Sequence, residues 1–320
     1  MRELIIKYST GQNNSRTCLR MIKNQSGVWQ NCKFIEGFDV TECDYWVIGH
    51  HLPYTETVLC PKENIIYIDA EPDSVKDYNV NFLQQFAFIL TARPNLQHAG
   101  VIKTHILSGW DVGAMHYINN KNSWNYDFFR TGKFTKTKVL SVISSAKQFT
   151  AGHKLRLNFT LKIKDYFKDK ISVFGRGINN FYDSFDVIAQ HKYHITLENC
   201  QLPDCFSEKL SNTFLCGAYP IYYGCPNIYD YFASDSLTVI DINDFTSAVE
   251  TIERVIEEDY FTKAQDAIEK ARIQVLDKYS IFPVVTSVIN ELEKRNLPHT
   301  KTKITLHAEE YFGPIMYKFI

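Results

Sequence analysis

Short apolar runs alternate with longer polar or amphipathic spacers along the whole chain. In the first half the apolar runs are Leu4–Ile6, Tyr45–Ile48, Ile65–Ile68, Phe86–Leu90 and Val101–Leu107. In the second half they are Val139–Ile143, Ile171–Phe174, Tyr193–Leu197, Tyr219–Tyr223 and Leu237–Ile240. Apolar runs separated by spacers of crossover length are typical of parallel strands covered by helices. The pattern therefore predicts an α/β protein.

The pattern breaks between residues 113 and 137, which are rich in Asn, Lys, Gly and Tyr. The chain has 320 residues, and single cores rarely grow beyond about 250 to 300 residues. We therefore expect a first Rossmann-like domain over residues 1–137, a second over 138–290 and a docked terminal segment over 291–320. Beyond Phe245 the apolar positions recur at helical spacing.

One segment between two predicted strands gives conflicting signals. Leu155, Leu157, Phe159, Leu161 and Ile163 alternate with polar residues, as in a strand. The flanking runs need a crossover connection if they are parallel, and this segment is the only material between them. We therefore predict a helix here.

Charge and cysteine content narrow the function classes. A net charge of -1 and a pI near 6.8 argue against the large basic surface that holds nucleic acid, so we expect no nucleic-acid partner. The eight cysteines show no C-x-x-C spacing, which indicates neither a zinc ribbon nor a thioredoxin-like pair. We expect free thiols in a reducing compartment.

The two ends of the chain bear on its location. The first seven residues show no signal-peptide apolar region, and no stretch reaches the roughly 18 apolar residues of a spanning helix. We therefore expect a cytoplasmic enzyme. The last 25 residues mix lysines with aromatic residues, which indicates either a docked segment or a weak contact with a membrane surface. A peripheral place at the membrane stays open.

The richest polar segment follows the apolar run that ends at position 197. Glu198 and Asn199 end this predicted strand, and Ser207, Glu208 and Lys209 open a helix after a short polar loop. Open α/β sheets bind ligands at the carboxyl edge of their strands. A serine cap, the free N–H groups of the helix and a lysine charge all favour an anion. The segment therefore predicts a phosphate or diphosphate site.

Four groups of residues carry a resemblance to a known family. They are Val173-Phe174-Gly175-Arg176-Gly177, Glu198-Asn199, Ser207-Glu208-Lys209-Leu210 and Pro220-Ile221-Tyr222-Tyr223-Gly224. In order and spacing they resemble the motifs of glycosyltransferase family 10, the α1,3/α1,4-fucosyltransferases, usually written V-x-F-G-R-x-G, F-x-E-N-S, Y-x-T-E-K and P-x-x-x-G. The resemblance covers residues 139–245. The tyrosine of the third motif is Cys205 here, with Phe206 as a substitute aromatic.

The resemblance implies a GT-B fold, with two Rossmann-like domains facing across a cleft and a GDP-sugar held by the second domain. The expected donor-binding residues are Gly175, Arg176, Glu198, Asn199, Ser207 and Glu208, and the expected leaving-group contacts are Arg156 and Lys209. Lys154 is a nearby competitor of Arg156. No D-x-D triplet occurs, and two cations beside a helix terminus can neutralise a departing diphosphate. We therefore expect neither a metal nor another cofactor.

Inverting transfer also needs a base on the acceptor side. The resemblance implies a glutamate just after a strand of the first domain. Glu71 follows the run Ile65–Ile68 and precedes Pro72. Glu71 is the expected base, with Asp69 and Asp73 as local alternatives.

The resemblance thus implies an inverting enzyme that moves L-fucose from GDP-β-L-fucose to a saccharide hydroxyl in an α1,3 linkage. The acceptor would be an oligosaccharide or glycoconjugate, as in protein glycosylation or lipopolysaccharide synthesis. Two alternatives stay open. Cys205 leaves room for a related transferase that uses another nucleotide sugar. A non-catalytic protein with the same pocket would bind a sugar nucleotide or a glycan.

Overall fold

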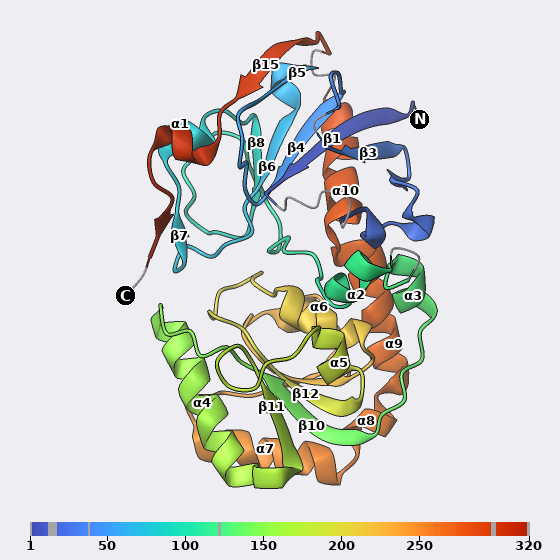
Figure 1. Ribbon diagram of the computed structural model, residues 1–320, viewed down its shortest axis with the longest axis vertical. Coiled ribbons are helices and arrows are strands. Elements are labelled where there is room, and N and C mark those ends of the chain that lie inside the picture. The colour runs from blue at the N-terminus through green and yellow to red at the C-terminus, as the bar shows by residue number, and fades with distance from the viewer. Residues whose placement is uncertain (1, 12–17, 38, 121–122, 296–298, 319–320) are drawn as a thin grey trace. The chain divides into compact units, whose positions relative to one another are not determined.

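The computed structural model describes residues 2–11, 18–37, 39–120, 123–295 and 299–318. The described chain forms two compact units, each on its own parallel sheet (Figure 1). Unit 1 contains the residues up to Ser108 together with Tyr279–Lys318, and unit 2 spans Gly109–Lys278. The two series of apolar runs predict these two sheets.

The sheet of unit 1 has the strand order β2-β3-β1-β4-β6-β8-β9. Every neighbouring pair is parallel except β2 with β3. The strand bounds are β1 Leu4–Thr10, β2 Val28–Trp29, β3 Cys32–Glu36, β4 Tyr45–Gly49, β6 Ile65–Ile68, β8 Phe88–Thr91 and β9 Val101–Lys103. All residues of β4 and β6 are buried, because central parallel strands are covered on both faces. Trp46, Tyr67 and Phe82 lie in the core on one face.

The terminal residues of the chain pair with unit 1 as two strands. β15 (Thr302–Leu306) is antiparallel to β5 (Glu56–Cys60), and β16 (Met316–Tyr317) is antiparallel to β7 (Lys76–Asp77). The described helices of unit 1 are η1 Cys18–Met21, η2 Lys23–Gln25, η3 Lys62–Asn64, α1 Val80–Leu83, α10 Ile281–Glu293 and η7 Glu309–Phe312. Strand pairing therefore docks the described terminal segment on unit 1.

The sheet of unit 2 has five parallel strands in the order β11-β10-β12-β13-β14. Their bounds are β10 Lys138–Ile143, β11 Ile171–Phe174, β12 His191–Leu197, β13 Tyr219–Tyr223 and β14 Thr238–Val239. The chain adds a strand on one side of β10 and then continues on its other side. This change of direction makes the carboxyl ends of β10 and β12 a topological switch point, where open α/β sheets bind their ligands.

Helices cover both faces of the second sheet (Figure 1). On one face, Val142 and Ile195 pack with Phe159 of α4 and Ile252 of α7. On the other face, the hydroxyls of Thr196 and Thr213 of α6 lie 2.9 Å apart. Adjacent strand residues point to opposite faces. The described helices of unit 2 are α2 Ala114–Asn119, α3 Tyr126–Thr131, α4 Ala151–Phe167, η4 Lys168–Lys170, α5 Ser184–Ile188, α6 Glu208–Leu215, η5 Ile228–Asp230, α7 Phe245–Glu257, α8 Tyr260–Lys263 and α9 Gln265–Gln274, and the π-helix η6 Val275–Tyr279 follows α9.

The segment with conflicting signals is helical, as predicted, because it lies inside α4. Thr150 caps this helix by accepting a hydrogen bond from the His153 N–H. Phe159 and Ile163 are buried, whereas Leu161 is 44% exposed. The apolar alternation of the segment therefore does not correspond to one buried face, and the crossover requirement decides its structure.

The bounds of the two units differ from the expected domain bounds of 137 and 290. The carboxylate of Asp183 accepts hydrogen bonds from the N–H groups of Gly113 and Met115, at 2.7 and 3.0 Å, which ties the start of α2 to unit 2. Phe282 of α10 packs its ring against Tyr8 of β1, at 5.6 Å between centroids, which ties α10 to unit 1. The irregular stretch thus opens unit 2, and the chain returns to unit 1 before residue 290.

Candidate functional site

The loops after β10 and β11 meet at the carboxyl edge of the second sheet. Gly175 has a φ of +150°, and a Cβ there would lie 1.7 Å from the carbonyl oxygen of Ser144. Only glycine fits so close an approach. The N–H of Ala146 donates to the carbonyl of Arg176, at 2.9 Å, while the Arg176 side chain is exposed. The expected donor residues Gly175 and Arg176 therefore lie beside the loop that leads into α4.

Arg156 lies at this same edge. Its side chain extends from the second turn of α4 and is only 5% exposed. Its Nη1 donates to the side-chain oxygen of Asn199 and to the carbonyl of Leu197. Its Nε is buried without a hydrogen-bond partner in the described chain. The structure thus brings together Arg156 and Asn199, which the sequence analysis assigned separately.

Glu198 is buried directly after β12, at 3% exposed. Its carboxylate accepts hydrogen bonds from the backbone N–H and the hydroxyl of Ser207, at 2.8 and 2.6 Å. Burial raises the pKa of Glu198, and the nearby Lys209 charge opposes this rise. A Cβ on Gly224 would lie 2.4 Å from the Glu198 side chain. Glu198 therefore holds the first turn of α6 against the strand ends.

The α6 N-terminus gathers the remaining predicted donor residues. Ser207 is the N-cap, and its hydroxyl accepts from the Lys209 N–H. The Nζ of Lys209 lies 2.8 Å from Glu208 and 3.6 Å from Glu198. Burial alone would lower the pKa of Lys209, but the Glu208 and Glu198 carboxylates outweigh it and hold that pKa above its ordinary value. Lys209 is 28% exposed at its side chain, so a charged amine remains within reach of a ligand.

His153 and Lys147 are two further residues of this edge that the sequence analysis missed. The pKa of His153 is lowered to about 4, first by burial and then by the charges of Arg156, Lys147 and Lys209. Each of these three cations disfavours a charged His153. Lys147 is exposed in the loop between β10 and α4. Its position just after a strand, like that of Glu198, is the sequence signal that would have indicated it.

Glu71 lies at the carboxyl edge of the other sheet, in unit 1. It follows β6 and is exposed. Asp69, two residues earlier, is 2% exposed, accepts hydrogen bonds from the Thr91 and Tyr78 hydroxyls and forms an ion pair with Arg93. Burial raises the pKa of Asp69, against the effect of the Arg93 charge. Of the three carboxylates considered for the base, Asp69 is thus enclosed and Glu71 reaches solvent.

The described residues also bear on metal binding, membrane crossing and disulfide formation. No group of three or more His, Cys, Asp or Glu is arranged to hold a metal ion among them. None of the helices in the described ranges has the length and apolar character needed to cross a membrane. All eight cysteines are free, as predicted.

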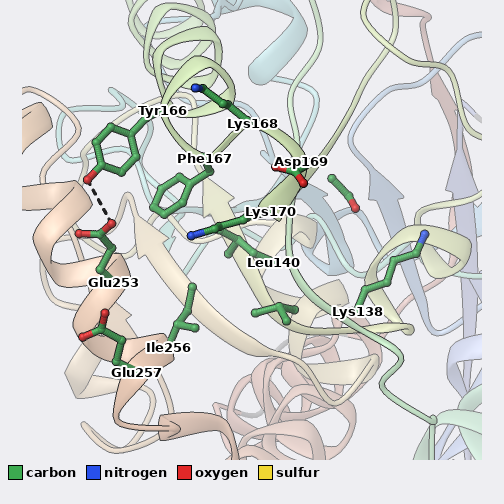
Figure 2. Close-up of a pocket in the computed structure, with 12 residues that line it drawn as sticks. Lys138, Leu140, Tyr166, Phe167, Lys168, Asp169, Lys170, Glu253, Ile256 and Glu257 are labelled. Atoms are coloured by element: carbon green, nitrogen blue, oxygen red, sulfur yellow. Dashed lines mark hydrogen bonds between the residues drawn. The ribbon is translucent and has the colours of Figure 1, made fainter.

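A cavity of about 790 Å³ opens at the amino edge of the second sheet (Figure 2). It is lined by the starts of β10 and β11, the end of α4 and one side of α7. Its charged lining residues are Lys138, Lys168, Asp169, Lys170, Glu253 and Glu257. No predicted site residue lines it, and cations and carboxylates are mixed around it. The predicted chemistry is therefore at the opposite edge.

Phe206 does not replace the tyrosine that the family has where this chain has Cys205. Its ring is 2% exposed and packs against Tyr231 and Phe232, at 4.8 and 5.5 Å between centroids. Cys205 is also buried, with its sulfur 3.1 Å from that of Cys200. The aromatic cluster behind the loop thus takes up the Phe206 ring, and a donor contact by Phe206 stays a prediction.

Comparisons with known proteins agree with the motifs. Residues 134–286 match the family described as glycosyltransferase family 10 (fucosyltransferase) C-term. A stretch of 78 residues is 31% identical to α-(1,3)-fucosyltransferase B of Drosophila melanogaster, and covers 24% of this chain and 17% of that protein. A stretch of 58 residues is 31% identical to GDP-fucose protein O-fucosyltransferase 3 of Danio rerio, and covers 18% of this chain and 13% of that protein. The matches span less than a fifth of these relatives.

The fold also resembles solved structures. A crystal structure of an α1,3-fucosyltransferase superposes with a TM-score of 0.51 at 12% identity, and the match covers 88% of this chain and 91% of that one. At this identity the likeness shows the fold alone. The predicted GT-B class, with two Rossmann-like domains, is confirmed.

Proposed function

We propose, from the match of residues 134–286 to the C-terminal domain of glycosyltransferase family 10, that the protein moves L-fucose from GDP-β-L-fucose to a saccharide hydroxyl. We further propose that the transfer inverts the anomeric centre and forms an α1,3 linkage. Two curated relatives are named as fucosyltransferases, and one of them as using GDP-fucose, which supports the choice of donor.

One observation carries the proposal. Arg156, Asn199 and Lys209 converge at the carboxyl edge of the second sheet, beside the capped N-terminus of α6. A helix N-terminus with adjacent cations is a ready site for a phosphate group. The buried Nε of Arg156, which has no hydrogen-bond partner in the described chain, is a donor that a phosphate oxygen would satisfy. The site therefore fits a nucleoside diphosphate.

The same charges suit the departure of GDP. Cleavage of the bond between the fucose anomeric carbon and the phosphate oxygen leaves a negative charge on the diphosphate. Arg156 and Lys209 would stabilise that charge as it develops. An interaction that is stronger in the transition state than with the bound substrate lowers the activation barrier. Protein groups supply the positive charge in this proposal, so transfer is expected to survive a chelator.

The acceptor hydroxyl loses its proton as its oxygen forms the new bond. We assign this proton to Glu71, because Glu71 is exposed just after a strand. Asp69, which lies two residues before it, already accepts from Thr91 and Tyr78 and is paired with Arg93. Fucose leaves GDP as the acceptor oxygen attacks from the opposite face. Glu71 ends the step protonated and GDP ends it as the free anion.

A second candidate is a related transferase that uses another nucleotide sugar. Cys205 and the enclosed ring of Phe206 leave no tyrosine-like group at the place where the family has one. This difference lies in the loop that connects Asn199 to Ser207 and so bears on the donor sugar. It favours a test of several donors rather than one.

The test is a panel of GDP-fucose, GDP-mannose and UDP-sugars. Binding is followed by thermal shift, and GDP or UDP release is followed with and without an array of saccharide acceptors. We expect GDP-fucose to bind, to release GDP slowly alone and faster with one class of acceptor. Release from a different sugar nucleotide would favour the second candidate. Binding with no release under any condition would identify a non-catalytic binding protein.

A further inference from the structure

Both backbone polar groups of Glu71 are hydrogen-bonded. Its N–H donates to the carboxylate of Asp69, at 3.3 Å, and its carbonyl accepts from the Nε of Arg93, at 3.0 Å. That Nε also lies 2.8 Å from Asp69. An exposed glutamate at the end of a strand usually lies on a loop whose backbone contacts water. Here a buried ion pair fixes its backbone instead.

The ion pair is itself fixed by its neighbours. The hydroxyl of Thr91, at the end of β8, donates to Asp69 at 2.7 Å, and the Tyr78 hydroxyl donates to it at 2.9 Å. The guanidinium of Arg93 lies over the ring of Tyr78, 4.7 Å from its centroid. Asp69 and Arg93 are 2% and 7% exposed. Groups from β8, from the segment after β8 and from the segment after β7 thus converge on one carboxylate.

The side chain of Arg93 contacts the residues around Asp69 and Glu71. The side-chain contacts described for it are those with Asp69, Tyr78 and the Glu71 carbonyl, and its Nη2 is buried without a hydrogen-bond partner in the described ranges. Burial of a charged pair is costly, and such a pair is weak evidence for stability. Stability alone therefore does not account for the pair, and positioning of the Glu71 backbone is a second role that the contacts support.

We propose that Asp69, through Arg93, is a positioning residue that fixes the Glu71 carboxylate for proton removal from the acceptor. The inference rests on the proposed function and on Glu71 as its base. A misplacement of about 1 Å at a reacting group can lower a rate by about 10²-fold. Loss of the clamp should therefore lower the rate of transfer and leave donor binding, which the other unit provides, unchanged.

A double-mutant cycle separates positioning from general stability. If Asp69 acts through Glu71, its replacement has nothing further to lose once Glu71 is gone, so the two losses do not add. A merely structural role would lower activity by the same factor in both backgrounds. The four proteins are wild type, Asp69→Asn, Glu71→Gln and the double variant. A Glu71→Asp background takes the place of Glu71→Gln if the latter rate is too low to measure.

The measurements are kcat for fucose transfer and Kd for GDP. We expect Asp69→Asn to lower kcat by about 10- to 100-fold, with Kd for GDP unchanged, and to have no further effect in the Glu71 variant. Asp44→Asn is the matched control. Asp44 is a buried aspartate of the same unit that accepts from the Ile5 N–H, and its effect should be equal in both backgrounds. If Asp69→Asn does not fold, Thr91→Val removes one donor to Asp69 and enters the same cycle.

The outcomes separate this inference from the proposed function. A wild-type protein that transfers no fucose, or a Glu71→Gln protein at full rate, overturns the assignment of the base and this inference with it. A working transferase in which Asp69→Asn keeps the wild-type kcat overturns only the positioning role. Equal losses in both Glu71 backgrounds also overturn it.

Discussion

Asp69 in unit 1 and Glu198 in unit 2 occupy matching places in the two sheets. Each follows a central parallel strand, and each is at most 3% exposed. Asp69 accepts from side chains of neighbouring strands and contacts the backbone of Glu71, which is exposed. Glu198 accepts from Ser207 and lies 3.6 Å from Lys209. Each buried carboxylate thus places a different functional group at its sheet edge.

The difference between the two edges lies in what surrounds the carboxylate. The edge of unit 2 has three cations that act together and the N-terminus of α6, so it favours an anion. At the edge of unit 1 the charge of Arg93 is paired with Asp69, and Glu71 is exposed. Similar parallel sheets therefore carry opposite chemistry, which depends on the few residues after each strand rather than on the fold.

The largest effect is expected at the edge of unit 1. Glu71→Gln keeps the shape of the side chain but removes the base, so kcat should fall by about 10²- to 10⁴-fold. GDP affinity should not change, because the donor residues lie on the other unit. Steady-state kinetics and calorimetry with GDP measure the two quantities. Asp73→Asn, two residues away and half-buried, is the matched control. An active Glu71→Gln protein, or a comparable loss of kcat in Asp73→Asn, would contradict the assignment of Glu71 as the base at the edge of unit 1.

At the edge of unit 2 the corresponding test is Arg156→Ala. Removal of one donor to a developing negative charge typically lowers kcat by about 10²- to 10³-fold. Lys154→Ala is the control, because Lys154 lies on the same helix but is exposed. Transfer rates and Kd for GDP are measured for both variants. Here, unlike at Glu71, a loss of GDP affinity is expected together with the loss of rate. Full activity of Arg156→Ala, or a greater loss in Lys154→Ala, would contradict the assignment.

A smaller effect is expected from a change in backbone packing. A Cβ on Gly152 would lie 1.9 Å from the carbonyl oxygen of Asn199, so Gly152→Ala must push the start of α4 away from Asn199. Overpacking of this kind costs about 1 to 3 kcal/mol. We expect a lower free energy of unfolding in urea and about tenfold weaker GDP binding, which is about 1.4 kcal/mol. Ala151→Ser adds an atom at the adjacent, exposed position and should change neither. Unchanged GDP affinity in Gly152→Ala would show that the contact between α4 and Asn199 does not shape the site.

The sequence predicts the central strands well, and the reason is burial. Ile65–Ile68 and Tyr219–Tyr223 have the predicted bounds, because strands covered on both faces leave uninterrupted apolar runs. β5 and β15 escaped prediction. They pair across more than 240 residues and bury only part of their side chains, so neither has a local pattern that indicates its partner.

The candidate site divides in a similar way. Motif spacing located Glu198, Asn199, Ser207 and Lys209, which are local to one strand and one helix. Arg93 was missed because its role depends on strands that become neighbours only in the fold, and Lys147 was missed because it lies outside the four motifs. The burial of Phe206 could not be predicted because its neighbours Tyr231 and Phe232 follow a later strand. Polar residues that lie close together in the sequence could therefore be predicted to form one site. Side chains that meet only through tertiary contacts could not.

The smallest expected effect concerns His153, which lies beside the cations at the edge of unit 2. Its pKa is about 4 in the folded protein, against an ordinary value of 6.5. Between these values the unfolded chain binds more protons than the folded one, so the free energy of unfolding rises with pH. The stability from this histidine is thus complete above about pH 6.5 and is lost as the pH falls toward 4. A shift of about 2.5 units corresponds to on the order of 3 kcal/mol.

His153→Gln should remove this dependence. Urea unfolding at intervals from pH 4 to 7 gives the free energy of unfolding of both proteins, and their difference isolates His153 from the other buried histidines. We expect the difference to change by a few kcal/mol across that interval and to be constant above it. Because Arg156, Lys147 and Lys209 all disfavour a charged His153, Lys147→Ala should reduce the change slightly. A difference between wild type and His153→Gln that does not vary with pH would mean that the pKa of His153 is not lowered in the folded protein. An unchanged pH dependence in Lys147→Ala would mean that the Lys147 charge does not act on His153, so the contrast between the two sheet edges would rest on Arg156 and Lys209 alone.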